Sequence, residues 1–409
     1  MKETKFKDTE LGKIPEEWEV CNLGSIGVPL MCKRIMKWQT NKTAGVPFYK
    51  IGTFGKQADA FIAPDIWRYM ITHFNYPKKG DILISAAGTI GRTVVFDGQP
   101  SYFQDSNIVW IDNDEEKVLN PYLEYAYTKI AWSTDASTIS RLYNSNLKSA
   151  LILFPHDKAE QQRIASALSD ADALVAELDV LIEKKRSIMA GIMQELLTGK
   201  RRLQGYNEKW KESAIEDIGN LIRGVSFDSD SVSTSFFENS IPILRANNIV
   251  DGNLFLHDLI FVDKHFVKKH QYHRENDILI CSANGSKRLV GKAALIKGDN
   301  NISFGAFMTT LRCKNASMAL YFSMFMRTDE YRKQINDLLC GSAINNLNSK
   351  QLYTIKLKHP SDQAEQRAIA SILSDMDAEI AELEAKRDKY KEVRQGMMQQ
   401  LLTGKIRLI

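Results

Sequence analysis

Polar and basic side chains form two sets, one in each half of this 409-residue chain, in loops beside predicted strands. Arginine can donate two hydrogen bonds to guanine, asparagine and glutamine match adenine, and lysine pairs with phosphate. The first set is Lys33, Arg34, Lys37, Lys56, Gln57, Thr89, Arg92, Asn144 and Asn146. The second set is Arg223, Arg245, Asn247, Asn248, Ser286, Lys287, Arg288, Asn345 and Asn346. Any single member is more often a solvated charge or a turn residue, so the hypothesis rests on the clusters.

The sequence contains none of the catalytic motifs that were sought. There is no G-x-x-x-x-G-K-[ST] phosphate loop, no H-E-x-x-H motif and no G-x-S-x-G motif. The run Gly52 to Lys56 is too short for a phosphate loop, and Gly88 to Gly91 lacks the third glycine of a dinucleotide fingerprint. No Asn-Pro-Pro-aromatic segment is present to position a base amino group for methylation. We therefore expect no catalytic residue and no cofactor in this chain.

Metal binding is not indicated either. The five cysteines are scattered, contain no C-x-x-C pair and read as small buried hydrophobes: Cys21, Cys32, Cys281, Cys313 and Cys340. The histidines, among them His265, His270 and His273, show no ligand spacing with partner carboxylates. The acidic run from Asp112 to Glu116 is typical of a solvated loop. The sequence predicts no metal site.

Length and composition indicate a folded, two-core protein. A chain of 409 residues is too long for one ordinary domain, and 44% hydrophobic with 25% charged residues is globular composition. The net charge of +4 is compatible with nucleic acid but does not establish it. The N-terminus is charged, and no run of eighteen apolar residues occurs, so we expect no signal peptide, no membrane span and a cytoplasmic location.

An internal repeat fixes the organisation. Residues 155–203 align without a gap with residues 360–408, each residue number being 205 higher in the second copy. Of the 49 aligned positions, 27 are identical. Identity at that level within one chain means that one supersecondary unit is built twice for the same task.

Each copy of the repeat predicts one long helix. Pro155 or Pro360 excludes helix upstream, and the aspartate two residues later, Asp157 or Asp362, is placed to cap it. Glutamates three residues further on, Glu160 and Glu365, complete a capping-box pattern. Both copies end in Thr-Gly-Lys, at 198–200 and 403–405, where glycine can supply a left-handed C-cap.

The apolar residues of both helices recur at spacings of three and four, the pattern of a coiled-coil seam. In the first copy they are Ile164, Leu168, Ala171, Val175, Leu178, Ile182, Met189, Ile192 and Leu196. In the second they are Ile369, Leu373, Met376, Ile380, Leu383, Tyr390, Met397 and Leu401. Lys185 and Arg387 interrupt the seams and indicate register-setting or snorkelling positions, not helix breaks. Helices of about 60 Å act as spacers, and an antiparallel pair buries both seams most economically.

The regions before the two helices are weaker copies of one α/β module. Trp18 to Gly27 aligns with Trp210 to Gly219, and Val46 to Lys50 aligns with Ile241 to Arg245. The strand Gly80 to Ser85 matches Asn276 to Cys281, and each leads into a glycine-bearing turn. Asn144 to Pro155 answers Asn346 to Pro360, each read as a polar turn and a short strand that feeds the helix. Because the second module has Asn276 in place of Gly80 and carries Asn284 before Gly285 in its turn, we expect that the loops of the two modules need not be alike.

This order of motifs resembles the specificity subunits of type I restriction-modification systems over nearly the whole chain, twice. The motifs are the Ile-Pro strand, the Gly-Asp-Ile-Leu strand, the glycine turn, and Asn-x-Leu before a Pro-bounded helix that ends in Leu-Leu-Thr-Gly. The resemblance implies two target-recognition domains, 1–154 and 204–359, and two spacer helices, 155–203 and 360–409, in a pseudo-two-fold α/β arrangement with an antiparallel coiled coil. It also implies partners: double-stranded DNA with a bipartite asymmetric site, two modification (methyltransferase) subunits docked on the helices, and restriction (translocase-nuclease) subunits that join this core.

Three hypotheses from different classes remain at this point. The first is the non-catalytic, DNA-reading specificity subunit, or its neighbour in a methyltransferase system without a restriction partner. The second is a self-contained nuclease or methyltransferase, which the missing motifs disfavour. The third is a coiled-coil adaptor that binds protein only, which the two large modules with polar loops disfavour.

Overall fold

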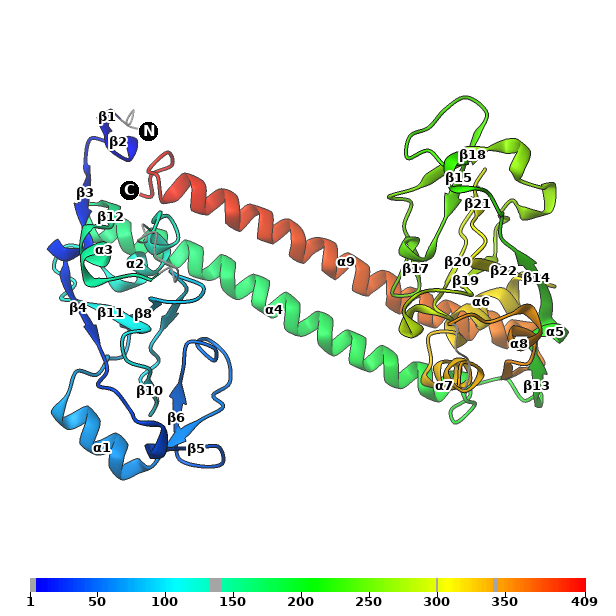
Figure 1. Ribbon diagram of the computed structural model, residues 1–409, viewed down its shortest axis with the longest axis horizontal. Coiled ribbons are helices and arrows are strands. Elements are labelled where there is room, and N and C mark those ends of the chain that lie inside the picture. The colour runs from blue at the N-terminus through cyan, green and yellow to red at the C-terminus, as the bar shows by residue number, and fades with distance from the viewer. Residues whose placement is uncertain (1–4, 133–140, 299–300, 341–344) are drawn as a thin grey trace. The chain divides into compact units, whose positions relative to one another are not determined.

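The computed structural model describes residues 5–132, 141–298, 301–340 and 345–409. The chain divides into two compact units. Unit 1 is Met1–Asp179 with Ala385–Ile409, and unit 2 is Val180–Glu384. Each unit therefore contains one globular module and a part of each of two long helices (Figure 1). The mixed α/β class and the two repeated modules agree with the prediction from sequence.

In the described part of unit 1, the module is built on short strands with three α-helices. The strands are β1 (Phe6–Thr9), β2 (Gly12–Pro15), β3 (Trp18–Asn22), β4 (Gly27–Met31), β5 (Thr40–Asn41), β6 (Val46–Tyr49), β7 (Phe61–Ile62), β8 (Ile82–Ser85), β9 (Thr93–Val95), β10 (Tyr102–Phe103), β11 (Ile108–Asn113) and β12 (Leu151–Pro155). The helices are α1 (Pro64–His73), α2 (Asn120–Tyr127) and α3 (Asn144–Ser149). The principal sheets have the orders β4-β11-β8-β9 and β10-β6-β7-β5, while β12 pairs with β3 and β1 with β2.

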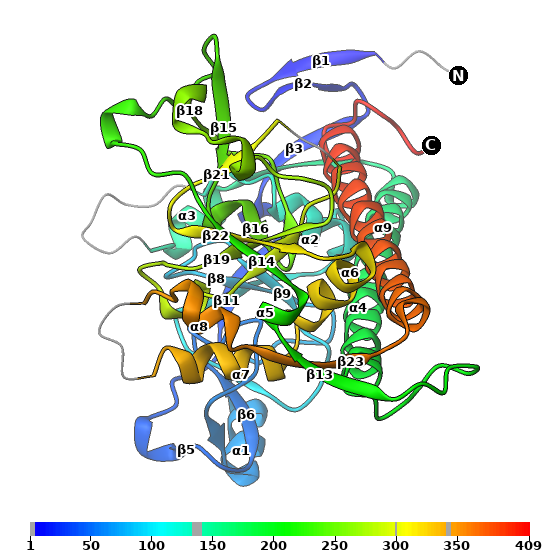
Figure 2. The ribbon, with the colours of Figure 1, turned by 90° about the vertical axis from the view of Figure 1, so that its right-hand side faces the viewer.

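The module of unit 2 repeats this plan. Its strands are β13 (Trp210–Ala214), β14 (Gly219–Arg223), β15 (Ser240–Leu244), β16 (Ile249–Val250), β17 (Asn253–Leu254), β18 (Ile260–Asp263), β19 (Asp277–Cys281), β20 (Ala293–Leu295), β21 (Ser303–Phe304), β22 (Met308–Cys313) and β23 (Lys356–Pro360). Its helices are α5 (Ile215–Ile218), α6 (Ala316–Phe325), α7 (Asp329–Leu338) and α8 (Ser349–Tyr353). The sheet β14-β22-β19-β20 corresponds to β4-β11-β8-β9, and β13 pairs with β23 (Figure 2).

The two long helices are α4 (Lys158–Leu197) and α9 (Gln363–Leu401). In unit 1 the start of α4 and the end of α9 share a core with the module, through Ile164, Leu168 and Leu401. In unit 2 the end of α4 and the start of α9 do the same, through Ile182 and Ile369 among others. Within each unit the two helix segments run in opposite directions, as the seam pattern predicts.

The helices pass through their charged seam positions without a break. Lys185 Nζ lies 2.6 Å from Glu379 of α9, and Arg387 Nη1 lies 3.3 Å from Asp179 of α4. Each cation therefore pairs with an acid of the facing helix segment of its own unit. Such pairs at the edge of a seam set register more than stability.

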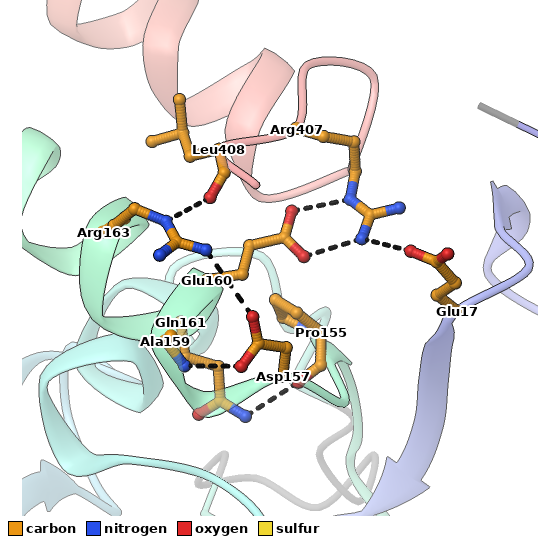
Figure 3. A network of polar contacts seen from close by, with 9 residues as sticks. All are labelled: Glu17, Pro155, Asp157, Ala159, Glu160, Gln161, Arg163, Arg407 and Leu408. Atoms are coloured by element: carbon orange, nitrogen blue, oxygen red, sulfur yellow. Dashed lines mark hydrogen bonds and ion pairs between the residues drawn. The ribbon is translucent and has the colours of Figure 1, made fainter. Parts of the chain in front are cut away.

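The capping prediction is half right. Asp157 accepts a hydrogen bond from Ala159 N at 2.9 Å, and Asp362 accepts one from Ala364 N at 2.7 Å, so both aspartates cap. The capping box is wrong, because the Glu160 carboxylate binds Arg407 instead of its own helix start (Figure 3). Glu365 is likewise bound by Arg202. A guanidinium offers a carboxylate two charge-assisted bonds, which outcompete one backbone N–H.

The helix ends follow the prediction. Gly199 and Gly404 adopt φ of +72° and +68°, the left-handed conformation that glycine tolerates best after a helix. One other expectation is wrong. The segment after Asn144 is the helix α3 and not a polar turn, because Asn146 Oδ1 accepts from Tyr143 N and starts a turn too short to show periodicity. Gly80 and Asn276 adopt the same left-handed φ, +94° and +66°, so this substitution leaves the turn unchanged.

Within the described ranges, no helix combines the length and the apolar character that crossing a membrane requires.

Candidate nucleic-acid interface

Backbone hydrogen bonds align the glycine turns of the two modules. In unit 1, Ser85 N donates to Arg92 O at 2.9 Å and Gly91 N donates to Ser85 O at 3.0 Å. In unit 2, Cys281 N donates to Lys292 O at 2.9 Å, and the glycine before Lys292 closes the same ring. Arg92 and Lys292 therefore hold equivalent positions. The turn that runs from Cys281 to Lys292 in unit 2 is longer than the turn from Ser85 to Arg92 in unit 1. It carries additional residues around Ser286 to Arg288.

A second set of bonds places two further segments against this turn in unit 1. Ala86 N donates to Asn107 O at 2.8 Å, and Leu142 N donates to Ala86 O at 2.9 Å. Ala87 forms an isolated β-bridge with Arg141. The Arg141 guanidinium also donates to Ser106 O at 2.7 Å, so the segments before β11 and before α3 meet beside the glycine turn.

Unit 2 repeats these contacts with other residues. Ser282 N donates to Phe307 O at 3.0 Å, Leu347 N donates to Ser282 O at 2.8 Å, and Ala283 bridges to Asn346. The backbone is thus conserved between the modules while the side chains differ. The equivalent pairs are Asn107 with Phe307 and Arg141 with Asn346.

This alignment corrects the match proposed from sequence. The sequence match pairs Asn144 with Asn346, each as the start of a polar turn before a short strand. The backbone contacts pair Asn346 with Arg141, and the helix starts pair Asn144 with Ser349. The gap-free offset of 205 residues seen in the long helices already holds here, since 141 + 205 = 346.

A basic residue stands at the end of the Pro-containing strand in each module. Gln104 N donates to Tyr49 O at 2.9 Å and Gly305 N donates to Leu244 O at 3.0 Å, which makes Lys50 and Arg245 equivalent. Lys50 Nζ lies 2.7 Å from Asp59. Arg245 Nη2 donates to Asp258 O at 2.7 Å. Each cation is therefore fixed in direction by the loop that precedes the neighbouring strand.

The segments around Lys50, Ser106 and Arg141 line a polar hollow of about 680 Å³ in unit 1. Its charged lining residues are Arg34, Lys37, Lys42, Lys50, Arg141, Asp59 and Asp105. Five cations against two carboxylates give a net charge of +3. The amides of Asn41, Gln104 and Asn107 add donors and acceptors. Such a concave, basic and amide-lined surface suits a phosphate backbone with exposed base edges.

The family model of the type I restriction modification DNA specificity domain matches residues 15–184 and again residues 207–392. The chain belongs to this family. The two matches are the two modules with the adjoining parts of the long helices, so each module is one specificity domain.

Curated relatives agree with this assignment. The Haemophilus influenzae protein named as type I restriction enzyme specificity subunit S.HindORF215P is 47% identical over 208 residues, 51% of each chain. The EcoKI specificity subunit of Escherichia coli is 31% identical over 199 residues, covering 49% of this chain and 43% of that one. These alignments span about half or less of those relatives. The MjaVIII specificity subunit of Methanocaldococcus jannaschii is 22% identical over 434 residues and is covered to 97%.

A solved structure shares the fold. The type I restriction-modification S subunit from M. genitalium matches with a TM-score of 0.63 at 17% identity. The match covers 97% of this chain and 98% of that one. The fold of the specificity subunits therefore extends over both modules and both long helices.

The residues predicted in the first specificity domain do not form one site, because they line two separate hollows or lie outside both. Arg34 and Lys37 line the basic hollow, and Arg34 Nε pairs with Asp105 at 2.8 Å. Lys56, Thr89 and Arg92 line a separate hollow of about 270 Å³ beside the glycine turn. The other predicted residues line neither hollow: Lys33, whose ammonium lies over the Phe74 ring, exposed Gln57, and Asn144 and Asn146 on α3.

In the second specificity domain most predicted residues are exposed. They are Arg223, Arg245, Asn247, Ser286, Lys287, Arg288 and Asn346, with Asn345 half-buried. Asn345 Nδ2 donates to Gly285 O at 3.0 Å and so joins the two loops. Asn248 is different, because its side chain is fully buried. It donates to Phe255 O and His257 O and accepts from Arg245 N, so it holds a loop together.

Sequence reasoning missed several residues of this surface. In the hollow these are Lys42, Lys50, Gln104, Asn107 and Arg141. In the second domain they are Lys292, which is equivalent to Arg92, and Phe307, which is equivalent to Asn107. Lys50 could have been found from its match with Arg245, and Arg141 from the 205-residue offset. Asn107 and Phe307 lie outside any gap-free match and emerge only from backbone contacts.

Proposed function

We propose that this chain is the DNA-specificity subunit of a type I restriction-modification complex. It is non-catalytic, and its two specificity domains read the two halves of a bipartite, asymmetric site in double-stranded DNA. The observation that carries the proposal is one backbone built twice with different side chains at equivalent positions, such as Arg141 and Asn346. Equal scaffolds give equal docking on the duplex, and unequal side chains give unequal base preferences.

The division of labour within the chain follows from the repeat. Residues 1–154 and 204–359 are the target-recognition domains, and residues 155–203 and 360–409 are the spacers between them. The helices repeat at 27 of 49 positions, whereas the modules differ in their loops. Identical surfaces suit identical partners, and differing surfaces suit the two halves of an asymmetric sequence.

The repeated helix surfaces support two modification subunits as partners, one for each copy. Methyl transfer and cleavage belong to these partners, and restriction subunits join the assembled core. We place this complex in the cytoplasm, with its DNA. Because the chain carries a net charge of only +4, we expect weak DNA binding by the isolated chain and tight binding by the complex, in which partner surfaces add phosphate contacts.

The test is co-expression with the type I modification subunit of the same host, in a strain that lacks this modification, followed by genome-wide mapping of methylated bases. The expected result is one asymmetric two-part motif with a fixed gap, absent when this chain is omitted. The matched control is the modification subunit expressed alone. Methylation that is unchanged by omission of this chain would contradict the proposal and favour the protein-only adaptor.

A further inference from the structure

Arg141 of the first domain and Asn346 of the second stand at one structural position. Arg141 precedes Leu142, whose N–H donates to Ala86 O just after β8. Asn346 precedes Leu347, whose N–H donates to Ser282 O just after β19. Both form the same β-bridge to the glycine turn. A ligand that docks alike on both domains therefore meets a guanidinium in one and a carboxamide in the other.

The Arg141 side chain is positioned before any ligand arrives. Its Nη2 donates to Ser106 O at 2.7 Å, and Arg141, Ser106 and Asn107 all line the basic hollow. A guanidinium carries five N–H donors, so this bond orients the group without exhausting it. An oriented guanidinium fork matches the O6 and N7 acceptors of guanine.

The second domain offers a different pair at this place. Asn346 is exposed, and its carboxamide has the donor and acceptor that match N7 and N6 of adenine. Phe307, which replaces Asn107, is 72% exposed although it is a large apolar residue. Apolar side chains contact the thymine methyl group in the major groove. Phe307 and the Asn346 carboxamide together match the groups that an A·T pair presents in the major groove. Because its ring is exposed, Phe307 adds little to the hydrophobic core.

We propose that Arg141 reads a guanine in the half-site of the first domain, and that Asn346 with Phe307 reads an A·T pair at the equivalent place in the other half-site. This inference rests on the proposed function, because it names the specificity-determining residues of that same surface. It makes this difference between the two half-sites depend on Arg141 in the first domain and on Asn346 with Phe307 in the second.

The experiment uses the purified complex of full-length chain and modification subunit. Its substrates are duplexes in which each base pair of the mapped motif is changed in turn, and the readout is the relative rate of methylation. In Arg141→Asn, we expect the preference for guanine at one position of one half-site to fall on the order of 10- to 100-fold, the range for one lost bidentate base contact. The other half-site should keep its wild-type profile.

Three further variants keep the result interpretable. Asn346→Arg, at an exposed position, should shift one position of the other half-site from an A·T pair towards guanine. Arg141→Lys keeps the charge but not the fork, so it should lose discrimination at the same position as Arg141→Asn. Arg68→Asn removes an exposed arginine on α1, which contributes no residue to the hollow, and should leave the base profile unchanged.

The outcomes separate this inference from the proposed function. If wild type methylates no bipartite motif, both fail. If wild type methylates one and Arg141→Asn or Asn346→Arg leaves every base preference unchanged, this inference alone is overturned. A uniform rate loss on all duplexes, with equal preferences, also overturns it, because that is the behaviour of a phosphate contact.

Discussion

Arg407, six residues beyond the last residue of α9, donates to both carboxylate oxygens of Glu160 in the first turn of α4, at 2.6 and 2.7 Å. Arg202 binds Glu365 in the same bidentate way at 3.0 and 2.6 Å. Arg407 is the equivalent of Arg202, and Glu365 is the equivalent of Glu160, each 205 residues later in the chain. In both pairs the segment after the end of one long helix therefore binds the first turn of the other long helix. In each unit the glutamate is buried, to 1% and 0% exposure.

Replacing Arg407 with alanine should destabilise unit 1. The change leaves the buried Glu160 carboxylate without its cation, and removal of one partner of a buried pair costs about 3 kcal/mol or more. Arg407 also bonds Glu17 at 2.8 Å, so the variant loses a contact to the turn before β3 as well. Urea unfolding at neutral pH should show a lower midpoint. The double variant Arg407→Leu with Glu160→Leu should be less destabilised than the single variant, because no charge is left buried.

The matched control is Arg186→Ala. Arg186 pairs with Glu384 of the facing helix segment, but its side chain is 51% exposed. An exposed pair contributes about 0 to 1 kcal/mol. Equal losses in Arg186→Ala and Arg407→Ala would show that burial of the Glu160 pair adds nothing to its effect.

Alanine at the helix-ending glycines should cost unequal amounts. Gly199 and Gly404 share the left-handed conformation, which disfavours alanine by about 1 kcal/mol at either position. A Cβ on Gly404 would lie 2.5 Å from Pro15 Cγ, whereas on Gly199 its nearest neighbour is the Trp210 ring at 3.1 Å. Gly404→Ala therefore adds a clash with a rigid ring and should cost about 2 to 3 kcal/mol in total. Equal unfolding midpoints for the two variants would contradict this.

The sequence predicted the features that depend on local pattern. The seams, the caps at Asp157 and Asp362 and the glycine ends each need only residues within one helix. The roles of Glu160 and Glu365 could not be predicted this way, because their partners lie about 160 to 250 residues away. Arg202 and Arg407 did carry a signal, since both copies keep an arginine two residues after the lysine of Thr-Gly-Lys.

The candidate interface could be predicted from the sequence only in part, and for a physical reason. An exposed asparagine and a buried asparagine that organises a loop look alike in sequence, as the neighbours Asn247 and Asn248 show. The buried Asn248 satisfies three backbone groups, which only the folded loop defines. Arg141 escaped notice because a single cation without neighbours in sequence gives no cluster until β-bridges assemble the hollow.

Removing two lysines of the hollow should weaken DNA binding by the complex without changing its sequence preference. Lys37 and Lys42 are exposed side chains that line the hollow and suit phosphates. In Lys37→Ala with Lys42→Ala, the slope of log affinity against log salt should become shallower by about 1 to 2. Arg68→Ala, a cation outside the hollow, is the control. An altered base preference in the double lysine variant would indicate base reading instead.

Acid should destabilise unit 2 through His273. Burial lowers the pKa of His273 from 6.5 to about 4, against the opposing effect of Asp277 and with a smaller contribution from Arg312. The ring lies against Phe304, with a centroid separation of 4.8 Å, and its side chain is 0% exposed. The folded protein therefore keeps this histidine neutral, whereas the unfolded chain takes up a proton near pH 6.5. The stability that comes from keeping His273 neutral is fully present above pH 6.5 and decreases as the pH drops below that value. At pH 5 the free energy of unfolding is lower by about 2 kcal/mol for this reason.

His273→Phe isolates this contribution from the carboxylates that titrate in the same range. Phenylalanine keeps the aromatic contact with Phe304 and removes two ring nitrogens that have no hydrogen-bond partner in the described chain. The relevant quantity is the difference in free energy of unfolding between pH 7.5 and pH 5, from urea titrations of wild type and variant. We expect this difference to be about 2 kcal/mol smaller in the variant, whatever its stability at pH 7.5. The same difference in both proteins would mean that His273 titrates alike in the folded and unfolded states.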